Sequence, residues 1–286
     1  MAAASQYEIR VMARADVDRT LDWAAAEGWN PGFDDARAFQ AADPSGFFMG
    51  WRGSEPVAAI SLIAYDSGFG FLGLYVVRKE YRGRGFGLAL WREALARRPT
   101  QLIGLDGVLA QQANYARSGF RLAYRSIRFG GPAPPGAESA TPVAVLKAAR
   151  ALPFDRLAAY DRLCFPAPRA AFLSLWLSPI AGTAVAAERD GRLCGFGAIR
   201  ACQTGYKIGP LFADDAATAD SIFLALAARA KGETLFLDVP EPNRPALQLA
   251  ERYALKPVFE TARMYTGASP DIDLARVFGV TTFELG

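Results

Sequence analysis

The sequence predicts an α/β protein built from two halves of similar design. Along its 286 residues, short runs rich in β-branched and aromatic residues alternate with segments of helical periodicity. The order of these elements in the first half recurs in the second. Between the halves, the segment GGPAPPGAESATP (130–142) is dense in Pro, Gly and Ala, which is typical of a linker. Together these observations indicate an internal duplication.

In the first half, periodicity and turn residues predict each element. The helix that follows residue 85 has a broad apolar side, which includes Leu90, Trp91 and Leu95. Glycines that permit left-handed backbone end two other helices, at Gly28 and Gly119. The expected elements are a strand over 7–12, helices over 16–28 and 34–42, a hairpin over 46–65, a strand over 69–77, a helix over about 86–97, a strand over 100–106, a helix over 110–119 and a strand over 120–129.

The second half repeats this order from residue 182 onward. Asp190–Gly191 is a strong hairpin-turn signal, and Asn243 with Pro245 marks a helix start. The expected elements are a hairpin over 182–203, a strand over 206–212, a helix over 214–230, a strand over 233–239, a helix over 243–253 and a strand over 255–265. The last strands of the halves match at a fixed offset, which places Tyr124 opposite Phe259 and Arg128 opposite Arg263.

Composition excludes several classes of protein. The net charge of +3 is weak for a nucleic-acid-binding protein, and no apolar run is long enough to span a membrane. The N-terminus lacks a secretory signal and the three cysteines form no disulfide framework, so we expect a cytoplasmic location. The chain has no histidine, which leaves acid–base chemistry to carboxylates, Tyr, Cys, Lys or water. The cysteines lack metal-ligand spacing, and no metal is expected.

One motif predicts a binding site for a diphosphate. Arg82-Gly83-Arg84-Gly85-Phe86-Gly87 lies between a strand and a helix, with Leu88 in the first turn. Glycine lets backbone N–H groups approach a ligand, and a helix N-terminus carries unpaired N–H groups and partial positive charge. The Gly-Lys-Ser/Thr of a P-loop is absent, and the spacing of a dinucleotide fingerprint fails. A glycine-rich turn with solvated arginines is the structural alternative.

The segment LYVVRKEYRGRGFGLALW (74–91) resembles the acetyl-CoA-binding signature of the GNAT superfamily of N-acetyltransferases. Arg82, Gly85 and Gly87 fill the signature positions, and YARSGF (115–120) is similar to a later element of that superfamily. The resemblance is fainter in the second half, where Asp214 and Asp215 stand at the phosphate position and would repel a diphosphate.

This resemblance implies two GNAT-like domains of mixed α/β (α+β type) fold. Each would have a mostly antiparallel sheet with a splayed parallel pair and flanking helices. The expected boundaries are 1–130 for an N-terminal domain that binds acetyl-CoA, 131–142 for a linker, and 143–286 for a C-terminal domain without CoA that helps to complete the acceptor pocket.

The resemblance also implies roles for particular residues. Main-chain groups of Tyr75, Val76 and Val77 would pair with the pantetheine arm of the acyl donor, acetyl-CoA. Tyr115 would protonate the leaving thiolate. Trp29, together with Asn30 and Asp34, lies where the superfamily's acceptor loop falls. The general base stays open among several carboxylates, which are Asp34, Asp35, Asp66, Glu80 and Asp106.

We therefore predict an enzyme that moves an acetyl group from acetyl-CoA to a primary amine, with a small molecule as the expected acceptor and a protein amine as the alternative. A non-catalytic acyl-CoA sensor or scaffold and an acyltransferase for longer acyl chains are the competing hypotheses. No nucleic-acid or membrane partner is expected, and the sequence does not define the oligomeric state.

Overall fold

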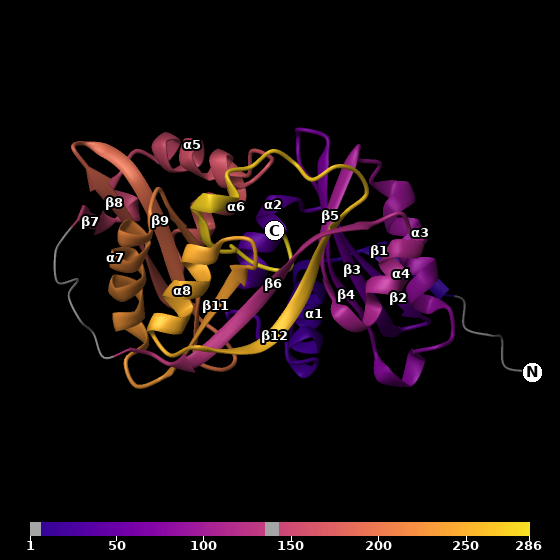
Figure 1. Ribbon diagram of the computed structural model, residues 1–286. Coiled ribbons are helices and arrows are strands. Elements are labelled where there is room, and N and C mark those ends of the chain that lie inside the picture. The colour runs from indigo at the N-terminus through magenta and orange to yellow at the C-terminus, as the bar shows by residue number, and fades with distance from the viewer. Residues whose placement is uncertain (1–6, 135–142) are drawn as a thin grey trace, which may run out of the picture.

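The computed structural model describes residues 7–134 and 143–286, and one thirteen-stranded mixed sheet runs through both halves of the molecule (Figure 1). The first half contains β1 (Tyr7–Val11), α1 (Arg14–Ala26), α2 (Asp35–Ala42), β2 (Phe47–Arg52), β3 (Glu55–Ala64), β4 (Phe69–Val77), α3 (Phe86–Arg97), β5 (Leu102–Val108), α4 (Gln112–Arg117) and β6 (Arg121–Pro132). The second half contains β7 (Val145–Ala148), α5 (Phe154–Cys164), α6 (Ala170–Trp176), β8 (Gly182–Arg189), β9 (Arg192–Ala201), β10 (Tyr206–Ala213), α7 (Ala216–Ala227), β11 (Thr234–Pro240), α8 (Arg244–Arg252), β12 (Lys256–Tyr265) and β13 (Val277–Gly279).

These elements confirm the predicted α/β fold and complete the repeat. β7, α5 and α6 had no counterpart in the sequence prediction, and they stand where β1, α1 and α2 stand in the first half. β13 is an addition without a partner in the first half. β6 continues to Pro132, so two residues of the expected linker belong to a strand. Residues 135–142 of that linker lie outside the described residues.

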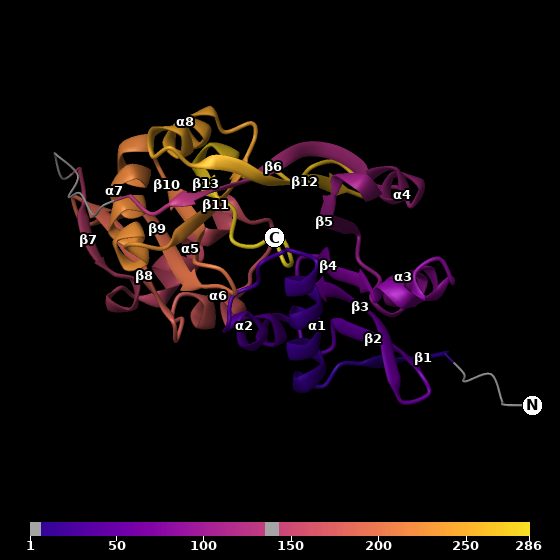
Figure 2. The ribbon, with the colours of Figure 1, turned by 90° about the horizontal axis from the view of Figure 1, so that it is seen from below.

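The two halves exchange their last strands at the centre of the sheet. The strand order β1-β2-β3-β4-β5-β12-β6-β11-β10-β9-β8-β7 places β12 of the second half beside β5, and β6 of the first half beside β11. β6 and β12 pair with each other along most of their length. In Figure 2 these two long strands bridge the halves. Each half therefore completes the sheet of the other.

Two equivalent buried ion pairs fix this exchange. Arg128 of β6 donates to Asp238 of β11 through Nε and Nη2, at 2.6 and 2.8 Å. Arg263 of β12 forms the matching pair with Asp106 of β5. The arginines are the two residues that the fixed offset in the sequence matched. Since all four side chains are almost fully buried, the register of the central strands is strongly specified.

Helices cover both faces of the sheet. On one face, α1, α2, α5 and α6 share a single apolar core that spans both halves, and the Phe39 and Trp176 rings stack there at 5.8 Å. On the other face, α3 and α4 cover a core of the first half, and α7 and α8 cover a separate core of the second. Among the described residues, no helix is both long and apolar enough to cross a membrane.

Candidate active site

A cavity of about 430 Å³ lies in the first half, where β4 and β5 separate. The two strands pair in parallel from Phe69 opposite Leu102 to Leu72 opposite Leu105, and beyond these pairs they diverge. A β-bulge lies in β4 at the same place, because Leu74 and Tyr75 together face one residue of β3. Leu74 has a left-handed φ of 46° there. This is the splayed parallel pair that the resemblance to the GNAT superfamily implied.

The glycine loop borders the open end of the cavity. Gly83 and Gly85 have φ values of 74° and 84°, which favour glycine, and a Cβ atom at either would meet nothing within 4 Å. Open space therefore faces the N-terminus of α3, where backbone N–H groups are unpaired. At Gly87 the backbone is crowded, since a Cβ would lie 2.6 Å from Tyr75 Oη and 2.8 Å from Val77 Cγ2. The loop thus combines room for a diphosphate with close packing of α3 on β4.

The two loop arginines lie differently. Arg82 donates to the Val77 carbonyl at 2.8 Å and pairs with Glu27 at 2.6 Å, so it fixes the loop to the end of β4. Arg84 does not line the cavity, and its guanidinium lies over the Tyr81 ring at 5.5 Å. All the other cofactor residues predicted from the sequence line the cavity, namely Tyr75, Val76, Val77, Arg82, Gly83, Gly85, Phe86, Gly87 and Leu88.

Tyr115 also lines the cavity. Its ring stacks on Trp91 at 5.7 Å and lies so close to Gly107 of β5 that a Cβ there would be 2.2 Å from Cε2. Burial raises the pKa of Tyr115 to about 12. At neutral pH the phenol therefore keeps its proton, which is the form that a proton donor needs.

The second half supplies part of the cavity wall. Phe259 and Thr261 come from β12, and Phe283 and Glu284 come from the segment that follows β13. Trp29, one of the three residues predicted to contact the acceptor, lines the cavity from the first half.

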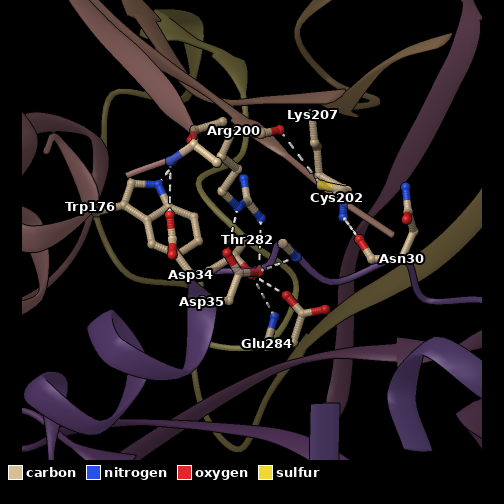
Figure 3. A network of polar contacts seen from close by, with 12 residues as sticks. Asn30, Asp34, Asp35, Trp176, Arg200, Cys202, Lys207, Thr282 and Glu284 are labelled. Atoms are coloured by element: carbon tan, nitrogen blue, oxygen red, sulfur yellow. Dashed lines mark hydrogen bonds and ion pairs between the residues drawn. The ribbon is translucent and has the colours of Figure 1, made fainter. Parts of the chain in front are cut away.

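Asn30 and Asp34, the other two predicted acceptor residues, do not line the cavity. The Asn30 amide exchanges two hydrogen bonds with the backbone of Thr204, at 2.9 and 3.0 Å. Asp34 accepts from the backbone N–H groups of Ile180 and Ala181, both at 3.0 Å. Both side chains therefore join the two halves, and their contacts belong to the polar network in Figure 3.

Among the carboxylates considered as general base, only Asp106 lines the cavity. Asp35 is buried against Arg200, Asp34 binds backbone, and Glu80 pairs with Arg78. The pKa of Asp106 is raised by burial, against the opposing effect of Arg263. Glu284, which was not among the candidates from the sequence, also lines the cavity. The segment TTFELG (281–286) is buried, and Glu284 is the one acidic side chain in it. A lone carboxylate among apolar and threonine residues was the signal available in the sequence.

The equivalent gap in the second half is filled by the chain itself. β10 and β11 pair in parallel only from Tyr206 to Ile208, and β13 then pairs with β10 at Leu211 and Phe212. These residues correspond to Val76 and Val77, because both pairs directly follow the bulge in their strand. At the N-terminus of α7, Asp215 accepts from Thr218 N at 2.8 Å. A side-chain carboxylate thus occupies the anion position of this half.

The three cysteines need no chemical role to explain them, because each is buried and packs as a small side chain. Cys164, Cys194 and Cys202 are buried free thiols, and burial raises the pKa of each. They therefore stay protonated and act as small apolar residues. Over the described ranges, no cluster of three or more His, Cys, Asp or Glu side chains could hold a metal ion.

Comparisons with known proteins agree with this geometry. Residues 14–120 match the acetyltransferase (GNAT) family model, and residues 157–279 match an acetyltransferase (GNAT) domain model. A holothin acyltransferase from Pseudoalteromonas sp. (strain SANK 73390) is 30% identical over 272 residues, which cover 93% of this chain and 90% of the relative.

Two solved structures share the fold. A candidate acetyltransferase from Pyrococcus horikoshii superposes with a TM-score of 0.82 at 22% identity, over 98% of this chain and 96% of its own. A tandem GNAT protein from the clavulanic acid biosynthesis pathway superposes with a TM-score of 0.63 at 16% identity, over 92% and 100%. With two matched domains and a full-length acyltransferase relative, this chain is a tandem-domain member of the GNAT acyltransferase family, whose enzymes use acyl-CoA donors.

Proposed function

We propose that this protein transfers an acetyl group from acetyl-CoA to a primary amine of a small molecule. The gap between β4 and β5 carries the proposal, because it begins at the glycine loop and ends at side chains of the second half. In the second half, β13 occupies the equivalent gap and pairs with β10. The pantetheine arm would take the corresponding place in the first half, beside Val76 and Val77.

The chemistry is direct attack. The neutral amine attacks the thioester carbonyl, a C–N bond forms, the C–S bond breaks and a thiolate leaves. A backbone N–H that holds the carbonyl oxygen contributes about 3 kcal/mol as negative charge develops on it. Tyr115 gives its proton to the thiolate. Since a phenol with a pKa of about 12 is a weaker acid than the thiol it forms, correct placement supplies most of its effect.

The walls of the cavity support a small, apolar or aromatic acceptor. Trp29, Phe259 and Phe283 give it aromatic sides. The main chain of Glu284 closes the gap against Gly73, where a Cβ would be 2.0 Å from the Glu284 carbonyl oxygen. We expect this closure to limit the length of the acyl group and so to favour acetyl over longer acyl groups. The name of the holothin acyltransferase makes holothin the first acceptor to test.

We further propose a single cofactor site per chain, in the first half. In the second half β13 fills the gap, and Asp215 holds the helix N-terminus where a diphosphate would bind. The second half would then act by completing the acceptor side.

Free-thiol release with a panel of amines tests the proposal. The panel contains holothin, aromatic amines, alkylamines and a lysine peptide, each with acetyl-, propionyl- and hexanoyl-CoA. We expect fastest release with acetyl-CoA and a small-molecule amine. Tight binding of acyl-CoA without release by any amine would instead identify a sensor, and preference for hexanoyl-CoA would overturn the acetyl assignment.

A further inference from the structure

We infer that Glu284, delivered by the second half, is the group that takes the proton from the acceptor amine. The inference rests on the proposed function and deepens it, because the first half contributes no suitable base of its own. Three features of Glu284 carry it: its position in the cavity, its lack of a cationic partner and the rigidity of the segment that bears it.

The position of Glu284 is at the point where β4 and β5 part. Its carbonyl oxygen lies directly against Gly73, the first residue of β4 beyond the last pair with β5. The residue lines the cavity and is only 5% exposed. Its neighbour Phe283 lines the same wall. A group at this end of the gap faces the reacting end of a donor whose diphosphate lies at the glycine loop.

Charge separates Glu284 from the other carboxylates of the cavity. Glu27 pairs with Arg82, and Asp106 pairs with Arg263. Within the described ranges, Glu284 has no Lys or Arg nitrogen within 4 Å. A carboxylate that is paired with a buried arginine is a poor proton acceptor, because protonation would leave the arginine uncompensated. Glu284 does not carry that cost.

The hydrogen bonds of Glu284 leave it able to accept a proton. The Thr282 hydroxyl accepts from the Glu284 backbone N–H at 3.3 Å and donates to Oε2 of the same residue (Figure 3). Oε1 has no hydrogen-bond partner among the described residues. Arg128 and Arg200 attract Glu284 only through space, and each forms its direct ion pair with an aspartate, Asp238 and Asp35 respectively. Oε1 is therefore the atom to which the proton would go.

The segment around Glu284 is fixed on both sides. Before it, Val280 N donates to the Asp238 carbonyl at 2.8 Å. After it, Tyr65 Oη donates to the Leu285 carbonyl at 3.1 Å, and Arg169 Nη1 donates to the Gly286 carbonyl at 2.7 Å. Contacts from both halves thus hold the carboxylate in place, as a catalytic group requires.

The proton balance is complete. As the C–N bond forms, the amine nitrogen loses one proton to Glu284, directly or through one water. As the C–S bond breaks, the thiolate gains one proton from Tyr115. The net change is one proton moved from nitrogen to sulfur. Exchange with solvent then returns Glu284 to the carboxylate and Tyr115 to the phenol.

The test compares variants in steady-state thiol release and in acetyl-CoA calorimetry. Glu284→Gln keeps the shape of the side chain and removes its basicity, so we expect kcat to fall about 100-fold or more, with the Kd for acetyl-CoA within twofold of wild type. Glu284→Ala leaves room for a small acid, and added formate is expected to restore part of its activity. Glu251→Gln, on the exposed face of α8, is the matched control and should behave as wild type.

Each outcome decides between explanations. If Glu284→Gln retains kcat within threefold while the wild type turns over, the inference is overturned and the proposed function stands. Joint loss of acetyl-CoA binding and thermal stability, without formate rescue, would show a structural role and also overturn it. A wild type that releases no thiol with any amine overturns the proposed function itself.

Discussion

Placing a negative charge at Gly85 is expected to abolish tight binding of acetyl-CoA. Because open space surrounds this position, a side chain there would fit without displacing protein atoms. A non-glycine residue at φ 84° costs about 1–2 kcal/mol of folding free energy. A carboxylate about 5 Å from a phosphate charge, at an effective dielectric constant of about 20, adds about 3 kcal/mol of repulsion. Gly85→Glu should therefore raise the Kd on the order of 100-fold beyond any effect of bulk.

Two further variants isolate the charge. Gly85→Gln carries the same bulk and backbone strain without the charge, and the ratio of the two Kd values should shrink as salt is added. Gly119→Glu adds the same charge at φ 90°, again in open space but at the end of α4, and should bind acetyl-CoA as wild type does. Calorimetry measures all three. Equal affinities for Gly85→Glu and wild type would refute the placement of the diphosphate at this loop.

Three more perturbations test the site and its support. Tyr115→Phe should lower kcat about 100-fold with little change in KM for the acyl donor, measured by thiol release across the pH range. Gly73→Ala places a Cβ 2.0 Å from the Glu284 carbonyl oxygen, so the backbone must move. We expect a loss of about 1–3 kcal/mol in stability and a lower kcat, with acetyl-CoA affinity retained. Burial alone would raise the pKa of Asp238, but the charge and hydrogen bonds of Arg128 hold it below its ordinary value. Because Asp238→Asn leaves Arg128 buried without its partner, we expect the substitution to cost about 3–5 kcal/mol in denaturant unfolding near pH 7. That difference is fully present above about pH 4, the unfolded pKa, and should disappear as the pH falls through the lower folded pKa.

Matched substitutions separate these effects from general destabilisation. Gly70→Ala, also in β4, would meet only the Thr100 side chain at 2.9 Å and should leave kcat unchanged. Asp271→Asn, at an exposed position between β12 and β13, should leave unfolding unchanged at every pH. Constant kcat in Tyr115→Phe, or a loss under 1 kcal/mol in Asp238→Asn, would contradict the roles given to these residues.

The sequence was sufficient for features that depend on local backbone chemistry. The loop from Arg82 to Gly87 was readable because positive φ and close approach demand glycine, and the helix after it begins at Phe86 as predicted. The division into repeats was readable from element order and from the offset of Arg128 and Arg263. Within the unassigned segment, α5 was also detectable, since Leu157 and Tyr160 with Cys164 are buried at helical spacing.

Features that depend on contacts between distant segments were not readable. Asn30 and Asp34 lie in the same predicted acceptor loop as Trp29. No local sequence feature shows whether their side chains contact an acceptor or, as in the structure, the backbone of residues 180–204. β13 is three residues long, and only the gap in the second half gives it a partner. Glu284 follows the same segment into the cavity of the other half, where it meets Gly73 of β4, more than 200 residues earlier in the sequence.

The strand exchange explains how the second half contributes to the cavity of the first half. β12 of the second half lies between β5 and β6 of the first, and it brings Phe259 and Thr261 to the cavity. It also brings Arg263 to Asp106, whose carboxylate would otherwise be buried without a cation at the edge of the cavity. A first half alone would therefore lose the partner strand of β5, the charge that balances Asp106 and one wall of the cavity. The second half is therefore part of this cavity by topology, and removing it would open the cavity to solvent along β5.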